Sequence, residues 1–120
     1  MSTYHYHHKY FRSATSTENG EVSSETLFHY RQKEPNIIWA TYEGGEILFG
    51  TLSGCILPNG ELEFCYQHQN QAGTFMTGKC RSTPSLLADG RIQLQERWQW
   101  TSGDQSKGES VIEEVSKWSQ

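Results

Sequence analysis

The sequence lacks the features that mark several common functional classes. It has no excess of positive charge, because 14 acidic residues outnumber 10 basic ones and leave a net charge of −4. A concentrated basic surface is what attracts a protein to nucleic acid or to anionic lipid, so neither partner is expected. No apolar run approaches the ~18 residues of a membrane helix, and no apolar segment of a signal peptide follows the amino terminus. We therefore expect a cytoplasmic protein.

Cysteine is also scarce. Cys55, Cys65 and Cys80 form an odd set without a C-x-x-C pair, which suits a reducing compartment better than a disulfide framework. Buried free thiols are the expected state. Cys80 is the one thiol for which reactivity or metal binding stays an alternative.

Catalytic signatures are missing as well. The chain has no G-x-S-x-G, no H-E-x-x-H and no G-x-x-x-x-G-K-[ST]. His5, His7 and His8 carry imidazoles that could bind a transition metal, but no acidic or thiol residue lies near them in the sequence. We expect residues 1–8 to form a flexible, solvated tail, and we predict neither a metal nor a cofactor.

What the sequence does contain is a regular series of turn signals. Asn19-Gly20, Gly44-Gly45, Asn59-Gly60 and Asp89-Gly90 are examples, and Ala and Leu are too sparse for long helices. The segments between the turns are short and rich in β-branched and aromatic residues. Eight strands are predicted, at residues 9–14, 25–33, 37–43, 46–54, 61–68, 74–82, 91–101 and 109–117.

Consecutive hairpins predict an all-β fold, an eight-stranded antiparallel up-and-down meander barrel. Closure removes the two open edges, and eight strands are enough for it. A sandwich is the alternative, but only 15–25 and 82–91 are long enough for crossovers. Residues 83–90 are expected to form a helical turn or to cap the barrel. At 120 residues the chain has room for one domain, residues 1–120.

Alternation along the strands predicts which side chains point inward. The inward set is Phe28, Tyr30, Ile38, Ala40, Tyr42, Leu48, Gly50, Leu52, Leu62, Phe64, Tyr66, His68, Gly78, Cys80, Ile92, Leu94, Glu96, Trp98, Trp100, Ile112 and Glu114. Trp39, Ile47 and Phe49 fall on the opposite face of the third and fourth strands. A strand that is apolar on both faces is usually covered on both, so we predict a homo-oligomer through these two strands.

Glu96 is the unusual member of the inward set, since it shares its face with Leu94, Trp98 and Trp100. An ionised carboxylate in an apolar interior must be paired, hydrogen-bonded or protonated. A turn centred near residue 105 places Glu96 opposite Glu114, where two carboxylates repel each other. This conflict predicts a polar cavity. The candidate ligand-binding residues are Tyr30, Tyr42, Tyr66, His68, Cys80, Glu96, Trp98, Trp100 and Glu114.

Three functions fit these features. The first is binding of a small, partly apolar molecule, with the indoles as walls and Glu96 as a polar anchor. The second is an enzyme that uses Glu96 and His68 as acid and base. The third is a self-associating structural module with a filled barrel. We favour binding over catalysis and name no catalytic residue.

Four motifs resemble a family of small bacterial proteins: STENGEVSSETLFHY, GKCRSTPSLLADGRI, LQERWQWTSGD and GESVIEE. The resemblance covers nearly all of the chain after residue 9. It implies an avidin-like or lipocalin-like meander barrel and an unidentified small-molecule ligand. Members of that family often carry the label N-acetylglutamate synthase, so the resemblance also implies acetyl transfer as an activity. The same motifs contain Glu96, Trp98, Trp100 and Cys80.

Overall fold

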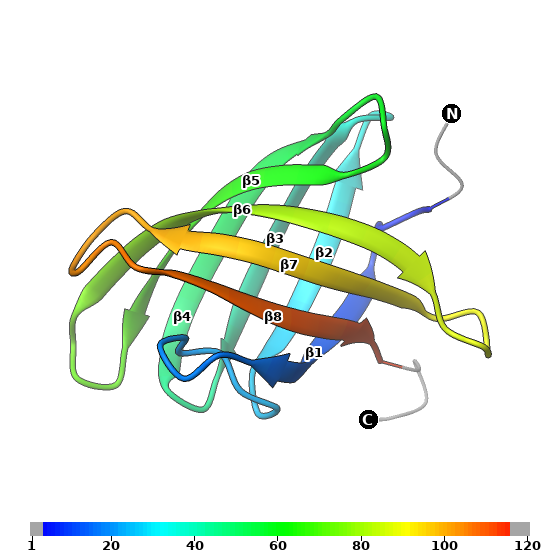
Figure 1. Cartoon of the computed structure of the whole chain (residues 1–120). Helices are drawn as coiled ribbons and strands as arrows, with labels where there is room; N and C mark the ends of the chain where they lie inside the picture. Colours follow the sequence, from blue (N-terminus) through cyan, green and yellow to red (C-terminus); the bar gives the residue numbers. More distant parts are fainter. Residues whose placement is uncertain (1–3, 116–120) are drawn as a thin grey trace.

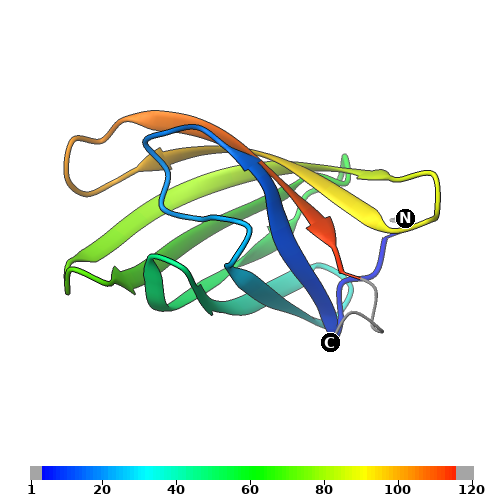
Figure 2. The same ribbon diagram turned by 90° about the horizontal axis from the view of Figure 1, so that it is seen from below.

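Each strand pairs with the one that follows it, and β8 returns to pair with β1, which closes the sheet into a barrel (Figure 1). The computed structural model describes residues 4–115. The strands are β1 (Lys9–Ser16), β2 (Leu27–Lys33), β3 (Ile37–Gly44), β4 (Ile47–Ile56), β5 (Leu62–Asn70), β6 (Phe75–Leu86), β7 (Ile92–Trp100) and β8 (Lys107–Glu114). Figure 2 shows β1 beside β8 at the closure. The predicted fold class and meander order are confirmed.

No helix capable of crossing a bilayer occurs in the part of the chain that the structure describes.

The β4–β5, β5–β6 and β6–β7 hairpins have the same pattern of backbone hydrogen bonds in their loops. In the loop from Leu57 to Glu61, the N–H of Leu57 donates to the Glu61 carbonyl at 2.7 Å, and the N–H of Gly60 donates to the Leu57 carbonyl at 2.8 Å. Gly60 has a φ of 90°, which a glycine adopts without steric cost. A three-residue loop that ends in such a glycine is a common hairpin, and it forms at the turn signal Asn59-Gly60.

Strand β6 continues further than the sequence indicates. It pairs with β7 as far as Leu86, and Pro84 lies opposite Leu94, so the helical turn predicted within residues 83–90 is wrong. Proline is tolerated in a strand where no ladder hydrogen bond needs its missing N–H. Pairing with β7 therefore outweighs the local preference of Pro84 for a helix start.

A bulge in β4 changes which side chains enter the core. The pairing between β4 and β5 shifts register between Ile47 and Phe49, so Ile47 is buried at 1% exposure whereas Leu48 is 46% exposed. A bulge inserts one extra residue and reverses the alternation beyond it. The inward prediction for Leu48 and the outward prediction for Ile47 are therefore both wrong. Trp39 and Phe49 are exposed, as predicted, and self-association through them stays a prediction.

The amino-terminal segment is part of the core. Tyr6 is fully buried, its ring lies 6.2 Å from that of Tyr30, and its N–H donates to Oε1 of Gln32 at 3.0 Å. The prediction of a solvated tail is therefore wrong for Tyr6, although His5, His7 and His8 are exposed. Residues 1–3 lie outside the described part. Tyrosines at 4 and 6 supply apolar area that closes the end of the barrel opposite the β1–β2 connection.

We expect Gly54→Ala to destabilise the protein by about 3 kcal/mol, because a side chain there overpacks the core. A Cβ atom on Gly54 would lie 2.0 Å from the Glu63 carbonyl oxygen and 2.6 Å from the Cα of Phe64. These are backbone atoms of β5, so relief requires the strands to move apart. Urea unfolding measures the difference, with Ser53→Ala on the exposed side of β4 as control. Equal stability of both variants would contradict this packing argument.

Candidate functional site

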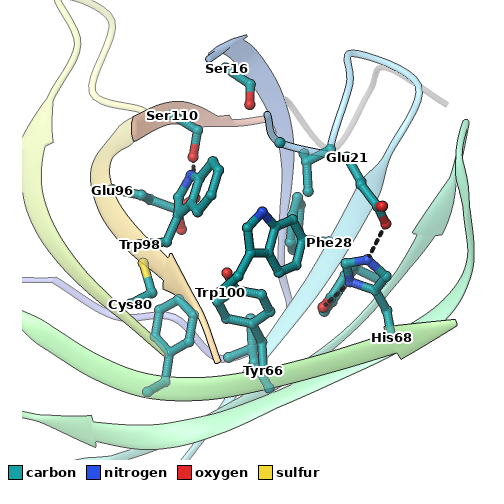
Figure 3. A pocket seen from close by; sticks show the side chains of 15 residues that line it. Ser16, Glu21, Phe28, Tyr66, His68, Cys80, Glu96, Trp98, Trp100 and Ser110 are labelled. Atoms are coloured by element: carbon teal, nitrogen blue, oxygen red, sulfur yellow. Dashed lines mark hydrogen bonds and ion pairs between the residues drawn. The ribbon is translucent and has the colours of Figure 1, made fainter. Parts of the chain in front are cut away.

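A cavity of about 40 Å³ lies in the barrel interior beneath the β1–β2 connection (Figure 3). Seven of the nine predicted ligand-binding residues line it, and Tyr30 and Glu114 do not. The lining side chains that argue for a site come from β2, β3 and β5 to β8 and from the β1–β2 connection: Glu21, Phe28, Tyr42, Tyr66, His68, Cys80, Glu96, Trp98, Trp100 and Ser110.

Glycines on the neighbouring strands allow the aromatic rings to lie flat across the sheet. Tyr66 pairs with Gly78, and a Cβ on Gly78 would lie 2.2 Å from the Tyr66 hydroxyl. Trp98 pairs with Gly108, where a Cβ would lie 2.3 Å from the indole. The positions of Gly78 and Gly108 therefore determine where the rings of Tyr66 and Trp98 lie in the cavity wall. The rings of Trp98 and Trp100 meet edge to face, with centroids 5.4 Å apart.

Glu96 reaches the cavity from β7 and is 6% exposed. Its Oε1 accepts a hydrogen bond from the Ser110 hydroxyl at 2.9 Å, and its Oε2 accepts one from the Ser82 hydroxyl at 3.4 Å. Burial disfavours the ionised form and raises the pKa of Glu96 to about 7, although the two serine hydrogen bonds oppose this increase. The carboxyl group is therefore poised between its two protonation states near neutral pH.

The predicted carboxylate pair does not form. Glu96 lies opposite Ser110, and Glu113 lies opposite Gln93, because the β7–β8 turn is centred near Gly103 rather than residue 105. Gly103 has a φ of 62°, a backbone conformation that glycine adopts without steric cost. Glu114 lies outside the cavity, where it accepts hydrogen bonds from Nζ of Lys9 and from the N–H of Ile92. The hydrogen-bond partners of Glu96 are instead the hydroxyl groups of Ser82 and Ser110.

Tyr30 and Cys80 are buried close enough to Glu96 to be affected by its charge. Burial, and secondly the charge of Glu96, raise the pKa of both groups well above their usual values. A thiol kept protonated in this way is a poor nucleophile. Buried free thiols are confirmed at Cys80, whereas Cys55 is half-buried and Cys65 is exposed. The Tyr30 hydroxyl has no hydrogen-bond partner within the described residues.

A hydrogen-bond network closes the mouth of the cavity. Oε1 of Glu21 accepts from Nε2 of His68 at 2.8 Å, and Nδ1 of His68 lies 2.9 Å from the Tyr42 hydroxyl. The Asn70 amide donates to both oxygens of Glu21, at 3.3 and 3.1 Å. The Asn19 carbonyl accepts from Nε1 of Trp100 at 3.0 Å, which holds the same connection against the indole. In Figure 3 the two indoles lie between Glu96 and the Glu21–His68 pair.

Sequence reasoning missed Glu21 and Ser110. Ser110 appeared opposite Trp100 in the predicted register, and the shifted turn moves it opposite Glu96. Glu21 belongs to a connection without periodicity, so alternation carries no information about where its side chain points. No local signal in the sequence distinguishes it from Glu18 or Glu25.

The arrangement of the amino-terminal histidines does not favour the metal site that the sequence left as an alternative for His5, His7 and His8. Nδ1 of His8 lies 3.4 Å from Nε2 of His29, and NH2 of Arg31 lies 2.9 Å from Nδ1 of His29. Because a guanidinium group only donates, Nδ1 accepts and Nε2 carries the proton of the neutral ring. Between residues 4 and 115, no three His, Cys, Asp or Glu side chains are arranged to hold a metal ion.

The closed meander agrees with the comparison to known families. The sequence profile described as "Avidin-like protein" matches residues 4–115, and the chain belongs to that family. No curated protein and no solved structure matches the chain. The match gives no support to the acetyl-transfer activity that the resemblance of the motifs implied.

Proposed function

We propose that the barrel binds a small, partly apolar molecule whose polar N–H or O–H group donates to Glu96 while its apolar part packs against Trp98 and Trp100. The observation that carries the proposal is the burial of Glu96 at the inner end of the cavity. Ser82 and Ser110 each donate one hydrogen bond to it. A carboxylate has about four acceptor positions, so capacity for a ligand donor remains.

The cavity is small for this role. A volume of about 40 Å³ holds about three or four waters, since one water needs roughly 10–15 Å³. A ligand of more than a few atoms therefore requires an indole or the β1–β2 connection to move. The filled-barrel alternative explains the small volume without a ligand, but it leaves the cost of burying Glu96 unexplained.

Catalysis by Glu96 and His68 is the second candidate function. Both residues line the cavity, yet Nε2 of His68 contacts Glu21 and its Nδ1 contacts Tyr42. Neither ring nitrogen contacts Glu96, so a substrate would have to lie between the two groups to use both. Turnover of a bound molecule by the wild type, and its loss in Glu96→Gln with binding retained, would favour this function over simple binding.

We expect the affinity for a donor-bearing ligand to fall about tenfold between pH 8 and pH 6. The donor needs ionised Glu96, and a pKa of about 7 leaves roughly one tenth of the protein ionised at the lower pH. A thermal-shift screen of soluble metabolites identifies the probe, and calorimetry then gives its affinity across the pH range. Glu96→Gln should bind it weakly at every pH.

The control for that experiment is Glu109→Gln, because Glu109 is exposed on β8 and its change leaves the cavity intact. It should reproduce the wild-type pH profile. Metabolites that stabilise wild type and Glu96→Gln equally, or a screen without any hit, would count against the proposed role of Glu96.

A further inference from the structure

We infer that His68 and Asn70 form a subsite for the carboxylate of the ligand, and that Glu21 occupies this subsite as an internal substitute. The inference rests on the proposed function and specifies its ligand as an acidic small molecule. Such a molecule would place its carboxylate at the mouth, its apolar part against the indoles and its hydrogen-bond donor near Glu96.

The geometry around Glu21 is that of a carboxylate receptor. One donor is Nε2 of His68, at 2.8 Å from Oε1, and the other is Nδ2 of Asn70, at 3.1 Å from Oε2. Carboxylate oxygens accept and do not donate, so the proton of His68 that faces Glu21 resides on Nε2. Both donors are buried, whereas the Glu21 side chain is 25% exposed. The donors belong to the barrel wall, and the acceptor comes from its entrance.

The two donors are held in place by contacts that do not involve Glu21. Oδ1 of Asn70 accepts from the N–H groups of Ala72 and Thr74, at 3.1 and 3.0 Å. These bonds fix the amide orientation and direct its NH2 group toward Glu21. The Tyr42 hydroxyl lies 2.9 Å from Nδ1 and orients the imidazole of His68. A site that stays in place when its occupant leaves loses little entropy on binding the next one.

An exchange of one carboxylate for another conserves the hydrogen bonds. If Glu21 left without a replacement, the buried donors of His68 and Asn70 would lose their acceptor, and an unpaired buried donor is unfavourable. A ligand carboxylate restores these bonds while Glu21 becomes hydrated at the mouth. Glu21 lines the cavity, so its departure also provides space that the closed site lacks.

Removal of the internal carboxylate should create measurable affinity for a simple external one. The probes are benzoate and benzamide, which share a ring but differ in charge. We expect Glu21→Ala to bind benzoate at least tenfold more tightly than wild type by calorimetry, with no comparable gain for benzamide. Glu25→Ala is the matched control, because Glu25 is an exposed acid in the same connection, and it should behave as wild type.

Two spectroscopic signals locate the bound probe. The ring of Trp100 lies 5.8 Å from that of His68, so benzoate should change the indole fluorescence of Glu21→Ala. It should also shift the Nε2 resonance of His68 in a long-range proton–nitrogen spectrum. If Glu21→Ala folds poorly, Glu21→Gln is the second variant, in which a smaller gain for benzoate is expected because its amide donors face Asn70.

Equal benzoate affinity in wild type and in both Glu21 variants would overturn the inference, as would an equal gain for benzamide. A metabolite that binds wild type in a Glu96-dependent manner would, in that case, leave the proposed function standing. Binding failure of every metabolite and of benzoate in all variants would reject both together.

Discussion

Glu96→Gln is expected to be more stable than wild type at pH 8, and the difference should be much smaller at pH 5. The folded state raises the pKa of Glu96 from 4.5 to about 7, so between these values the folded protein binds more protons than the unfolded chain. The free energy of unfolding of wild type therefore falls as the pH rises through this window. The loss approaches about 3 kcal/mol, because each tenfold change in the acid dissociation constant corresponds to about 1.4 kcal/mol. Glutamine carries no such charge.

We attribute this pH dependence of the free energy of unfolding to Glu96 and not to the thiol and phenol groups around it. Burial raises the pKa of Cys80, Tyr30 and Tyr42, so these groups stay protonated below pH 8. Urea unfolding at pH 5, 6, 7 and 8 gives the stability difference between wild type and Glu96→Gln at each pH. Taking the difference between the two proteins removes the contribution of every group that titrates in both. For the control Glu109→Gln, the stability difference from wild type should not change with pH. A constant difference for Glu96→Gln would show that the acid is not desolvated.

Tyr6→Ala is expected to lower the free energy of unfolding by about 3 kcal/mol. Truncation of a fully buried aromatic side chain removes its apolar contacts and leaves a cavity, which typically costs about 3–5 kcal/mol for phenylalanine or tryptophan. Tyr6 is fully buried against Tyr30 at the end of the barrel. Urea unfolding measures the loss, and His5→Ala, at an exposed neighbouring position, should change the stability by less than about 0.5 kcal/mol.

The direction of the stability change in Tyr6→Phe shows whether Tyr6 acts through apolar packing or through a hydrogen bond of its hydroxyl. The Tyr6 hydroxyl is buried without a hydrogen-bond partner within residues 4–115, and a buried unpaired polar group costs about 1–3 kcal/mol. Tyr6→Phe should therefore be at least as stable as wild type. If Tyr6→Ala were harmless, residues 4–8 would not close the barrel in solution. A marked loss in Tyr6→Phe would reveal a partner for the hydroxyl.

The sequence predicted the features that depend on neighbouring residues. Alternation placed Leu94, Glu96, Trp98 and Trp100 on one face, and glycine-containing turns divided the chain into eight strands in the observed order. The sequence-based prediction failed where the strand register depends on the exact number of residues, at the bulge beside Ile47 and in the turn at Gly103. A local pattern does not specify such insertions, because either register satisfies the hydrophobic alternation nearby.

By itself, the sequence determined that strands would form, follow one another and enclose a buried acid with aromatic neighbours. Only the tertiary structure decided that Ser110 and not Glu114 would face that acid, that Glu21 would reach His68 and that Tyr6 would close the opposite end. Strand formation follows from side-chain pattern over a few residues. Contacts between residues 47 positions apart, such as those of Glu21 and His68, exist only because closure of the barrel brings the two segments together.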